Sequence, residues 1–449
     1  MIGIGLDITR AGQTVSFSPE NLRVGTRDVR DLTLRPNRMY SNPAGTTLIA
    51  GPGAEVAAMR DSRGVIVLKQ TTFGARLKYA VQPAGGIRNR LLNNRGDGAV
   101  VGVLGSGGVL PADMLISGIA AGSIEVLTLA PKNGRPNTKV RINGTPTGNV
   151  NINFAGSQVI PAVAGQVWTS SVWSQMTAGS STNLNSINLS TTTHAANGGF
   201  LTSFANNFFS TIGDDVRRSV VGTLVGGTIA FVSSSVQLTW TSGAIDITFD
   251  ISAQQLEQAG AATDVQIVGA DGLDVTEAGQ RPINQLAWDA ADDFMAFESN
   301  FAPTGAYLLA ASRAPGSGFP STVTFDGSPP GALFVQSIAT QLSADGSGNS
   351  AFFEPAGWPS GLPGVRRLDM IRVNAAGDAQ AWRNGVLATT GITLAGDMIP
   401  LAAINRLGRA GSSGRFSGGL LLDEGDTPLT ESERLMTERY LAYNGGITL

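Results

Sequence analysis

The stretch that decides the fold is Ile245-Asp-Ile-Thr-Phe-Asp-Ile251, in which apolar and polar residues alternate without a break. Successive side chains of a β-strand point to opposite faces of its sheet, so this period of two predicts a half-buried strand. Val150-Asn-Ile-Asn-Phe154 repeats the pattern. Residues 203–218 instead predict a loop or a short helix. Further candidate strands lie at residues 124–129, 138–142, 167–173, 184–189 and 236–240. Seven or more short strands at this spacing predict a sandwich or jelly roll.

The last third of the chain contains two specific local signals. Gln380-Ala-Trp-Arg-Asn-Gly-Val386 predicts a hairpin that ends at a tight Asn-Gly turn. After an apolar strand at residues 420–422, Thr430 can cap a helix while Glu433 completes a capping box. Gly445 is predicted to be the left-handed residue at the C-terminal end of that helix. The chain is therefore expected to end in a strand, a turn and one short capped helix.

The composition limits the classes of function. Of 449 residues, 42% are hydrophobic and only 14% are charged, so the chain can bury large cores, and this composition argues against disorder. The net charge of -3 has no basic patch behind it, which argues against nucleic acid as a partner. With no cysteine and one histidine, disulfides, Cys-ligated zinc and thiol catalysis are excluded. The N-terminus lacks the pattern of a signal peptide, and no apolar run predicts membrane insertion.

Several motifs resemble parts of phage virion proteins. The segment Ala164-Gly-Gln-Val-Trp-Thr-Ser-Ser-Val-Trp173 resembles a strand of carbohydrate-binding-module-like jelly rolls in phage fibres, and residues 253–263 resemble the strand that closes such a domain. Residues 274–295 resemble the opening of a laminin-G/concanavalin-like domain in the same proteins, and residues 416–446 resemble its end. The resemblance implies two sandwich domains that recognise carbohydrate or adhesive surfaces.

An earlier stretch resembles the connector of tail and fibre-like proteins from alphaproteobacterial phages and gene transfer agents. It comprises Asp61-Ser-Arg-Gly64, Gln70-Thr-Thr72, Arg76 and residues 85–92. Arg63 interrupts the first piece, and Leu77 stands where that family has proline. The predicted organisation is an N-terminal attachment region at 1–85, a jelly roll at 86–268 and a laminin-G-like jelly roll at 269–449. The fold class is all-β, with one short C-terminal helix.

The function implied by the resemblance is that of a non-enzymatic virion surface protein. Such a fibre, head spike or tail-tip protein of a tailed phage or gene transfer agent would bind host surface polysaccharide. Its partners would be that polysaccharide, other virion proteins and copies of itself, with a trimer expected, and it would be located on the extracellular particle. Two alternatives remain open. One is a purely structural head-decoration or baseplate component, and the other is a capsule depolymerase.

Candidate site residues follow from the chemistry of sugars and cations. An indole face stacks on the C–H face of a pyranose, which favours Trp358 in a Pro/Gly-rich loop and, more weakly, Trp382 and Trp173. His194 reads as an exposed histidine in a polar loop. No catalytic pair or triad is expected. Calcium is a possible cofactor, since carboxylates close in sequence could supply its oxygen ligands: Asp289, Asp292 and Asp293.

Overall fold

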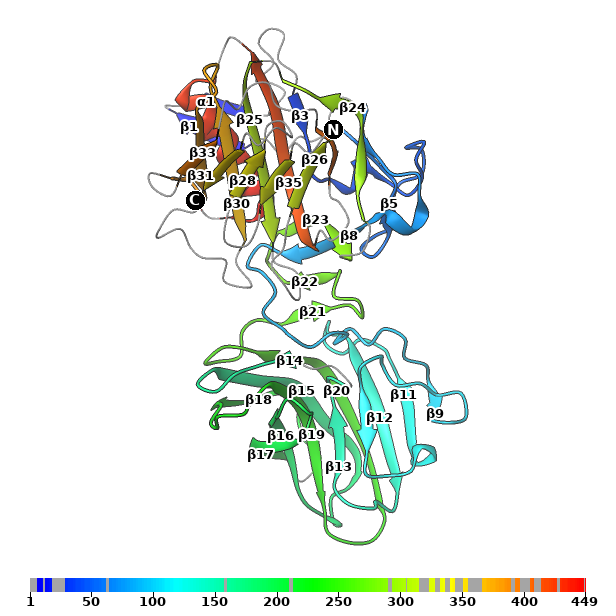
Figure 1. Cartoon of the computed structure of the whole chain (residues 1–449). Coiled ribbons are helices and arrows are strands. Elements are labelled where there is room, and N and C mark those ends of the chain that lie inside the picture. The colour runs from blue at the N-terminus through cyan, green and yellow to red at the C-terminus, as the bar shows by residue number, and fades with distance from the viewer. Residues whose placement is uncertain are drawn as a thin grey trace. The chain divides into compact units, whose positions relative to one another are not determined.

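The computed structural model resolves most of the chain into two compact units, which are described separately here (Figure 1). One is discontinuous and comprises residues 1–86 and 281–449, and the other is an inserted unit at 87–280. The all-β prediction with one short C-terminal helix is confirmed. Within the described residues, no helix combines the length and apolarity needed to cross a bilayer. The structure describes residues 6–10, 13–17, 29–61, 64–156, 160–209, 213–289, 293–303, 305–314, 323–327, 332–335, 340–343, 350–353, 366–388, 392–395, 404–407, 413–425, 429–447 and 449.

Eight strands of the inserted unit form a jelly roll. They alternate between two antiparallel sheets, with β12-β20-β15-β18 in one and β13-β19-β16-β17 in the other, which is jelly-roll order. Short strands extend both sheets at their edges. The principal strands are β12 (Asn137–Gly144), β13 (Val150–Asn153), β15 (Val167–Ser180), β16 (Leu184–His194), β17 (Phe200–Phe209), β18 (Val216–Thr223), β19 (Phe231–Trp240) and β20 (Ile245–Glu257). The flanking strands are β9 (Gly102–Val103), β10 (Leu115–Ser117), β11 (Ile124–Thr128) and β14 (Ile160–Pro161).

Alternation along these strands fills the space between the two sheets. Ile187 and Leu189 of β16 point inward, as do Ile247 and Phe249 of β20, and all four are buried. Trp168 is also part of this core, so its role is packing. Residues 203–218, predicted to be a loop or short helix, instead contain most of β17 and the start of β18.

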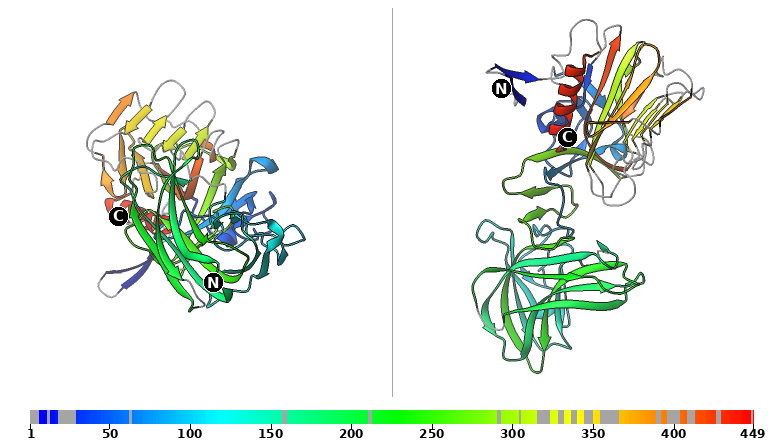
Figure 2. Two further views of the ribbon diagram at one scale, coloured as in Figure 1. Left: turned by 90° about the horizontal axis from the view of Figure 1, so that it is seen from below. Right: turned by 90° about the vertical axis from the view of Figure 1, so that its left-hand side faces the viewer.

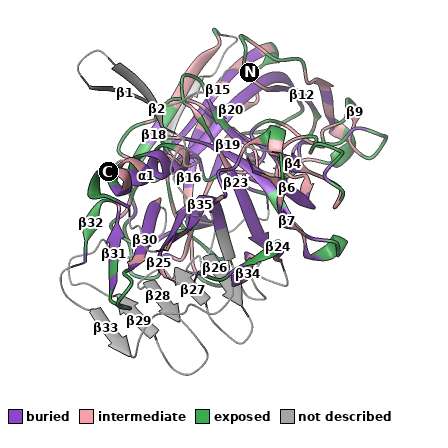
Figure 3. Ribbon diagram, turned by 90° about the horizontal axis from the view of Figure 1, so that it is seen from above, coloured by how far each residue is buried: buried purple, intermediate pink, exposed green. Residues whose placement is uncertain are grey.

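The discontinuous unit places two large antiparallel sheets face to face, with a helix outside one of them (Figure 2). The nine-stranded sheet has the order β32-β31-β30-β25-β35-β23-β8-β5, and β3 also pairs with β35. Its strands are β3 (Val29–Asp31), β5 (Glu55–Val56), β8 (Leu77–Pro83), β23 (Pro282–Asp289), β25 (Ala306–Ala314), β30 (Arg367–Val373), β31 (Ala379–Arg383), β32 (Val386–Leu387) and β35 (Ser413–Gly425). Figure 3 shows the burial of β25, β30 and β35 at its centre.

The second sheet of this unit has ten strands in the order β33-β29-β28-β27-β26-β34-β24-β7-β6-β4. Like the first sheet, it combines both segments of the discontinuous unit, because β7 from the first segment pairs with β24 from the second. The strands are β4 (Met39–Tyr40), β6 (Ala58–Arg60), β7 (Ile66–Lys69), β24 (Met295–Phe301), β26 (Val323–Gly327), β27 (Ala332–Val335), β28 (Thr340–Ser343), β29 (Ser350–Phe353), β33 (Ile392–Ala395) and β34 (Ile404–Leu407).

The predicted separate region at 1–85 is therefore corrected. β8 lies between β5 and β23, and β3 pairs with β35, so this segment supplies strands to the sheets of the C-terminal domain. Leu68, Leu77 and Tyr79 are buried in the same core as Leu286 and Phe416. The predicted limit near 85 does coincide with the start of the inserted unit at 87, which continues to 280 rather than 268.

Both local signals in the last third of the chain are found in the structure. Asn384 and Gly385 have φ values of 49° and 83° between β31 and β32, as a tight hairpin turn requires. Helix α1 (Glu431–Gly445) begins with the capping box of Thr430 and Glu433. Its left-handed C-terminal residue is Gly446, with φ 66°, rather than Gly445. The helix packs Tyr440, Leu441 and Ala442 against the nine-stranded sheet.

This division of the chain predicts which segments fold alone. A polypeptide of residues 87–280 contains a complete core and should melt cooperatively, since its two sheets use no strand from elsewhere. A polypeptide of residues 281–449 lacks β7 and β8, which leaves apolar faces of β23 and β24 uncovered, and should not melt cooperatively. Calorimetry on the two polypeptides tests both statements. Cooperative melting of 281–449 would contradict the assignment of β7 and β8 to its core.

Candidate functional site

A row of four rings crosses the outer face of one jelly-roll sheet. Phe200 and Phe231 both pair in register with His194, and Phe231 pairs in turn with Pro161. Cross-strand partners share a sheet face, so these residues from β17, β16, β19 and β14 form a continuous ring row. Phe200 is 67% exposed, while His194 and Phe231 are half-buried. His194 therefore occupies the end of a strand, which corrects its prediction as a loop residue.

Beside this ring row, the outward positions of β16 and β19 carry only uncharged polar side chains. Thr192 pairs with Ser233, Ser190 with Ser235, Asn188 with Gln237 and Ser186 with Thr239. None of these outward positions on β16 and β19 carries Asp, Glu, Lys or Arg. On the neighbouring β13, Asn151 and Asn153 continue two of the rows. These residues form an ordered surface of hydroxyl and amide groups. We call this surface, together with the ring row, the uncharged face.

Hydrogen bonds connect side chains across this face. Gln237 Nε2 donates to Asn151 Oδ1 at 3.0 Å, and Ser186 Oγ donates to Thr239 Oγ1 at 3.1 Å. Near the ring row, His194 Nε2 and Ser233 Oγ lie 2.9 Å apart. Short side chains that are already held in place lose little conformational entropy when they bind a ligand. Each hydroxyl and amide group still has further donor or acceptor capacity to offer.

The outer face of the opposite sheet has a different character, because it is charged. Asp250 accepts hydrogen bonds from Lys132 and, at 3.1 Å, from Asn137, while Lys139 Nζ lies 3.6 Å away. Arg141 and Asp246 form a two-pronged ion pair at 2.8 and 2.9 Å, which lowers the pKa of the Asp246 carboxyl. These cations all have carboxylate partners within the sheet. They hold β12, β20 and the loop after β11 together.

Trp173 lies on this charged face, and a guanidinium group covers its ring. Arg135 Cζ is 3.9 Å from the centre of the indole ring, and Arg135 also forms an ion pair with Asp215. Arg217, the cross-strand partner of Trp173, has its guanidinium pKa lowered by burial. The ring face that a pyranose would need is thus occupied by Arg135. The structure indicates a packing role for Trp173, unlike the predicted sugar contact.

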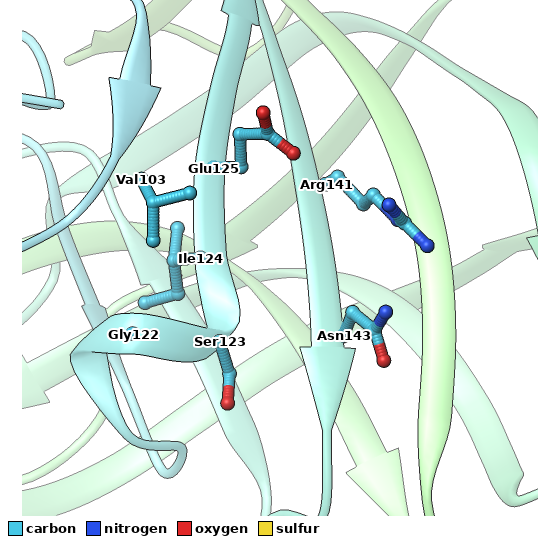
Figure 4. Close-up of a pocket in the computed structure, with 7 residues that line it drawn as sticks. All are labelled: Val103, Gly122, Ser123, Ile124, Glu125, Arg141 and Asn143. Carbon is cyan, nitrogen blue, oxygen red and sulfur yellow. The ribbon is translucent and has the colours of Figure 1, made fainter. Parts of the chain in front are cut away.

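A shallow pocket of about 200 Å³ opens beside β11 and β12 on the charged face (Figure 4). The Glu125 carboxylate points toward β12, and the Arg141 guanidinium points toward the neighbouring strand β20, where Asp246 accepts its hydrogen bonds. No aromatic residue lines the pocket, so it offers no stacking surface for a sugar. Its full lining is Val103, Gly122, Ser123, Ile124, Glu125, Arg141 and Asn143.

Two buried carboxylates elsewhere in the inserted unit are held by one arginine. Arg88 donates to Glu277 Oε1 at 2.6 Å and lies 3.8 Å from Glu257 Oε1. Gln266 Nε2 donates to Glu277 Oε2 at 2.9 Å, and Asn89 donates to the Gln254 carbonyl at 3.2 Å. This network fixes the segment that resembles the phage connector onto the end of β20. Both carboxylates already have cationic or amide partners and are closed to solvent, which suits a structural role.

The other tryptophans that the structure describes do not form a shared site. Trp382 is only 6% exposed, and Arg434 lies over its ring at 4.5 Å, so the structure contradicts its predicted role in sugar stacking. Trp288 is buried against Phe416, and Trp240 donates its indole N–H to the Gly243 carbonyl at 2.9 Å. Trp358 lies outside the described residues, so its sugar contact stays a prediction.

The structure describes only part of the predicted calcium site. Asp289 is the last residue of β23, and Asp293 is 4% exposed, whereas Asp292 and the side chain of Asp289 lie outside the described part. Among the residues whose side chains are described, no group of three or more histidines and carboxylates is placed to hold a metal ion. Calcium binding therefore stays a prediction.

Comparisons with known proteins add little to this geometry. No protein-family model matches the chain, and no curated protein matches it. The chain is similar to a solved structure described as "Truncated AlyQ with CBM32 and alginate lyase domains". The similarity has 8% sequence identity and a TM-score of 0.22, and it covers 64% of this chain and 90% of that chain. At that TM-score it carries no argument about fold or function.

The contact of Trp173 with Arg135 predicts a measurable coupling. In a double-mutant cycle of Trp173→Leu and Arg135→Met, the two changes should couple by about 0.5–2 kcal/mol, the range for a partly desolvated cation–π pair. Urea unfolding of residues 87–280 gives the four free energies. Trp173→Leu with Arg141→Met, whose partner is Asp246, is the matched control and should show additive effects. Additive effects in the first pair would mean that the ring contact contributes no stability.

Proposed function

We propose that the chain is a carbohydrate-binding protein and that its uncharged face is the binding site. The single observation that supports this most strongly is the ring row of Phe200, His194, Phe231 and Pro161 beside rows of hydroxyl and amide groups. An aromatic face attracts the C–H face of a pyranose ring, while donors and acceptors beside it satisfy the sugar hydroxyls. The uncharged face provides both kinds of contact on one rigid sheet.

The exposure of Phe200 favours binding over packing. Its side chain is 67% exposed although it is one of the largest apolar groups of the inserted unit. Leaving such a side chain in water gives up about 1.5–3 kcal/mol of burial free energy, which a ligand could recover. The inward residues of β16, by contrast, are fully buried.

The biological setting is proposed from the sequence resemblance. We propose that the protein is a non-enzymatic surface component of a phage or gene-transfer-agent particle, where it binds host polysaccharide. Its other partners would be virion proteins and further copies of the chain, as a trimer. Purified particles probed with an antibody against the chain would test this location. Labelling confined to the host cell would overturn it.

The proposed function predicts the effect of removing the most exposed ring. Phe200→Ala should weaken polysaccharide binding by at least about 1 kcal/mol, the scale of an exposed aromatic contact. The free energy of unfolding should change by no more than about 0.5 kcal/mol, because the side chain is mostly exposed already. Adsorption of the full chain to immobilised host polysaccharide measures the first quantity, and a urea melt measures the second.

Val225→Ala is the matched control for this substitution. Val225 is 68% exposed and apolar in the same unit, but it lies outside the uncharged face. The control should leave adsorption unchanged. Equal adsorption by the Phe200→Ala variant and the unsubstituted chain would remove the ring row from the binding site.

A further inference from the structure

The rows of the uncharged face extend much further than one sugar ring. Eight residue steps separate Ser186 from His194 along β16, and their partners on the antiparallel strand β19 extend over the same length, from Thr239 to Phe231. At about 3.3 Å per residue, this strip is about 26 Å long. A single pyranose stacked on the ring row would contact only one end of this strip. The length of the strip fits an oligosaccharide segment.

Charge is separated between the two outer faces of the jelly roll. The outward positions of β13, β16 and β19 carry only uncharged side chains, whereas Lys139, Arg141, Asp246 and Asp250 lie on the opposite sheet. A carboxylate or sulfate group that leaves water needs a cationic partner to offset its lost hydration. The uncharged face offers none. It is suited to ligands that carry hydroxyl groups alone.

Low relief at the middle of the strip favours close approach by a chain. Ser190 and Ser235 pair with each other there and are 6% and 7% exposed, lying lower than the larger side chains of Asn188 and Gln237 beside them. Asn188 Nδ2 donates to Ser186 Oγ at 2.9 Å, so this part of the face is also preorganised. A continuous row of small polar groups leads from there toward the ring row.

We infer that the uncharged face binds a neutral polysaccharide over several consecutive sugar units, with the chain lying along β16 and β19. This inference rests on the proposed function and adds the class and extent of the ligand. The ring row holds one sugar by stacking, while the hydroxyl and amide rows hydrogen-bond to the following units. Each row adds contacts only when the oligosaccharide is long enough to reach it.

Calorimetric titration of the full chain with oligosaccharides of defined length tests this inference. The probes are di- to hexasaccharides prepared from neutral glucans and galactans, with oligogalacturonates as acidic counterparts of matched length. For the neutral series that binds, affinity should rise by at least about tenfold from the disaccharide to the hexasaccharide. It should change less than about twofold up to about 0.5 M sodium chloride, because no ion pair forms.

One substitution separates the far end of the strip from the ring row. Thr239→Arg places a bulky cation at the end opposite Phe231, and should lower hexasaccharide affinity by about tenfold while leaving disaccharide affinity within about twofold. Thr177→Arg is the matched control, since Thr177 is a half-buried outward residue on the opposite sheet and its change should affect neither probe. Phe200→Ala should weaken both probes.

The outcomes distinguish this inference from the proposed function. Affinity that is independent of length, or equal effects of Thr239→Arg on both probes, would show a single-sugar site and overturn the extended ligand. Tighter binding of oligogalacturonates would overturn the neutral class. Either result leaves carbohydrate binding itself intact. A full chain that melts cooperatively but binds neither these probes nor host polysaccharide would instead overturn the proposed function.

Discussion

The pleat of β16 and β19 is the constraint on which the proposed binding face depends. Because side chains alternate strictly along a strand, burying Ile187 and Leu189 forces Asn188 and Ser190 to the outside. A shift of one residue in register would expose the apolar set and bury the amides. The core therefore fixes the positions of the binding groups. The free energy that stabilises the jelly roll also maintains the geometry of its uncharged face.

The discontinuous unit shows how far a sheet can depend on distant segments. β8 provides the link between β5 and β23, although about 200 residues separate it from β23. Pairing of this kind leaves no local signature, because the strand pattern of residues 77–83 is compatible with many partners. The sequence therefore does not indicate the sheet to which β8 belongs. The inserted jelly roll occupies the chain between two adjacent strands of one sheet.

What the sequence predicted well is local. The Asn384-Gly385 turn and the Thr430/Glu433 capping box depend on residues within a few positions of one another, and both form. The error of one residue at Gly446 is the usual uncertainty of a helix end. Strict alternation also identified β13 and β20. The strand spacing and the family resemblance predicted a jelly roll, and the strand pairing of the inserted unit has jelly-roll order.

The candidate site was predicted poorly, for physical reasons. Tryptophan indicates a sugar site only where its ring is open, but the sequence does not show whether an indole is covered, and Arg135 and Arg434 cover two of them. Phe200 and His194 were missed because they meet across a β-bulge between β16 and β17. Only the pairing register shows that they share a row. The available signal is the absence of charged residues from 186–194, of which residues 184–189 are predicted to be a strand.

If the uncharged face binds carbohydrate as proposed, its lack of charge determines how the ligand is captured. Without a local field, ligand encounter gains nothing from electrostatic steering, and affinity depends on short-range stacking and hydrogen bonds. Each net hydrogen bond contributes only about 0.5–1.5 kcal/mol, so the proposed face alone would bind a polysaccharide modestly. Several copies on one assembly would raise the effective concentration of the remaining faces once the first has bound. Repetition in the ligand and in the assembly can then supply avidity that a single jelly roll lacks, and such binding would persist in salt concentrations that screen charged adhesins.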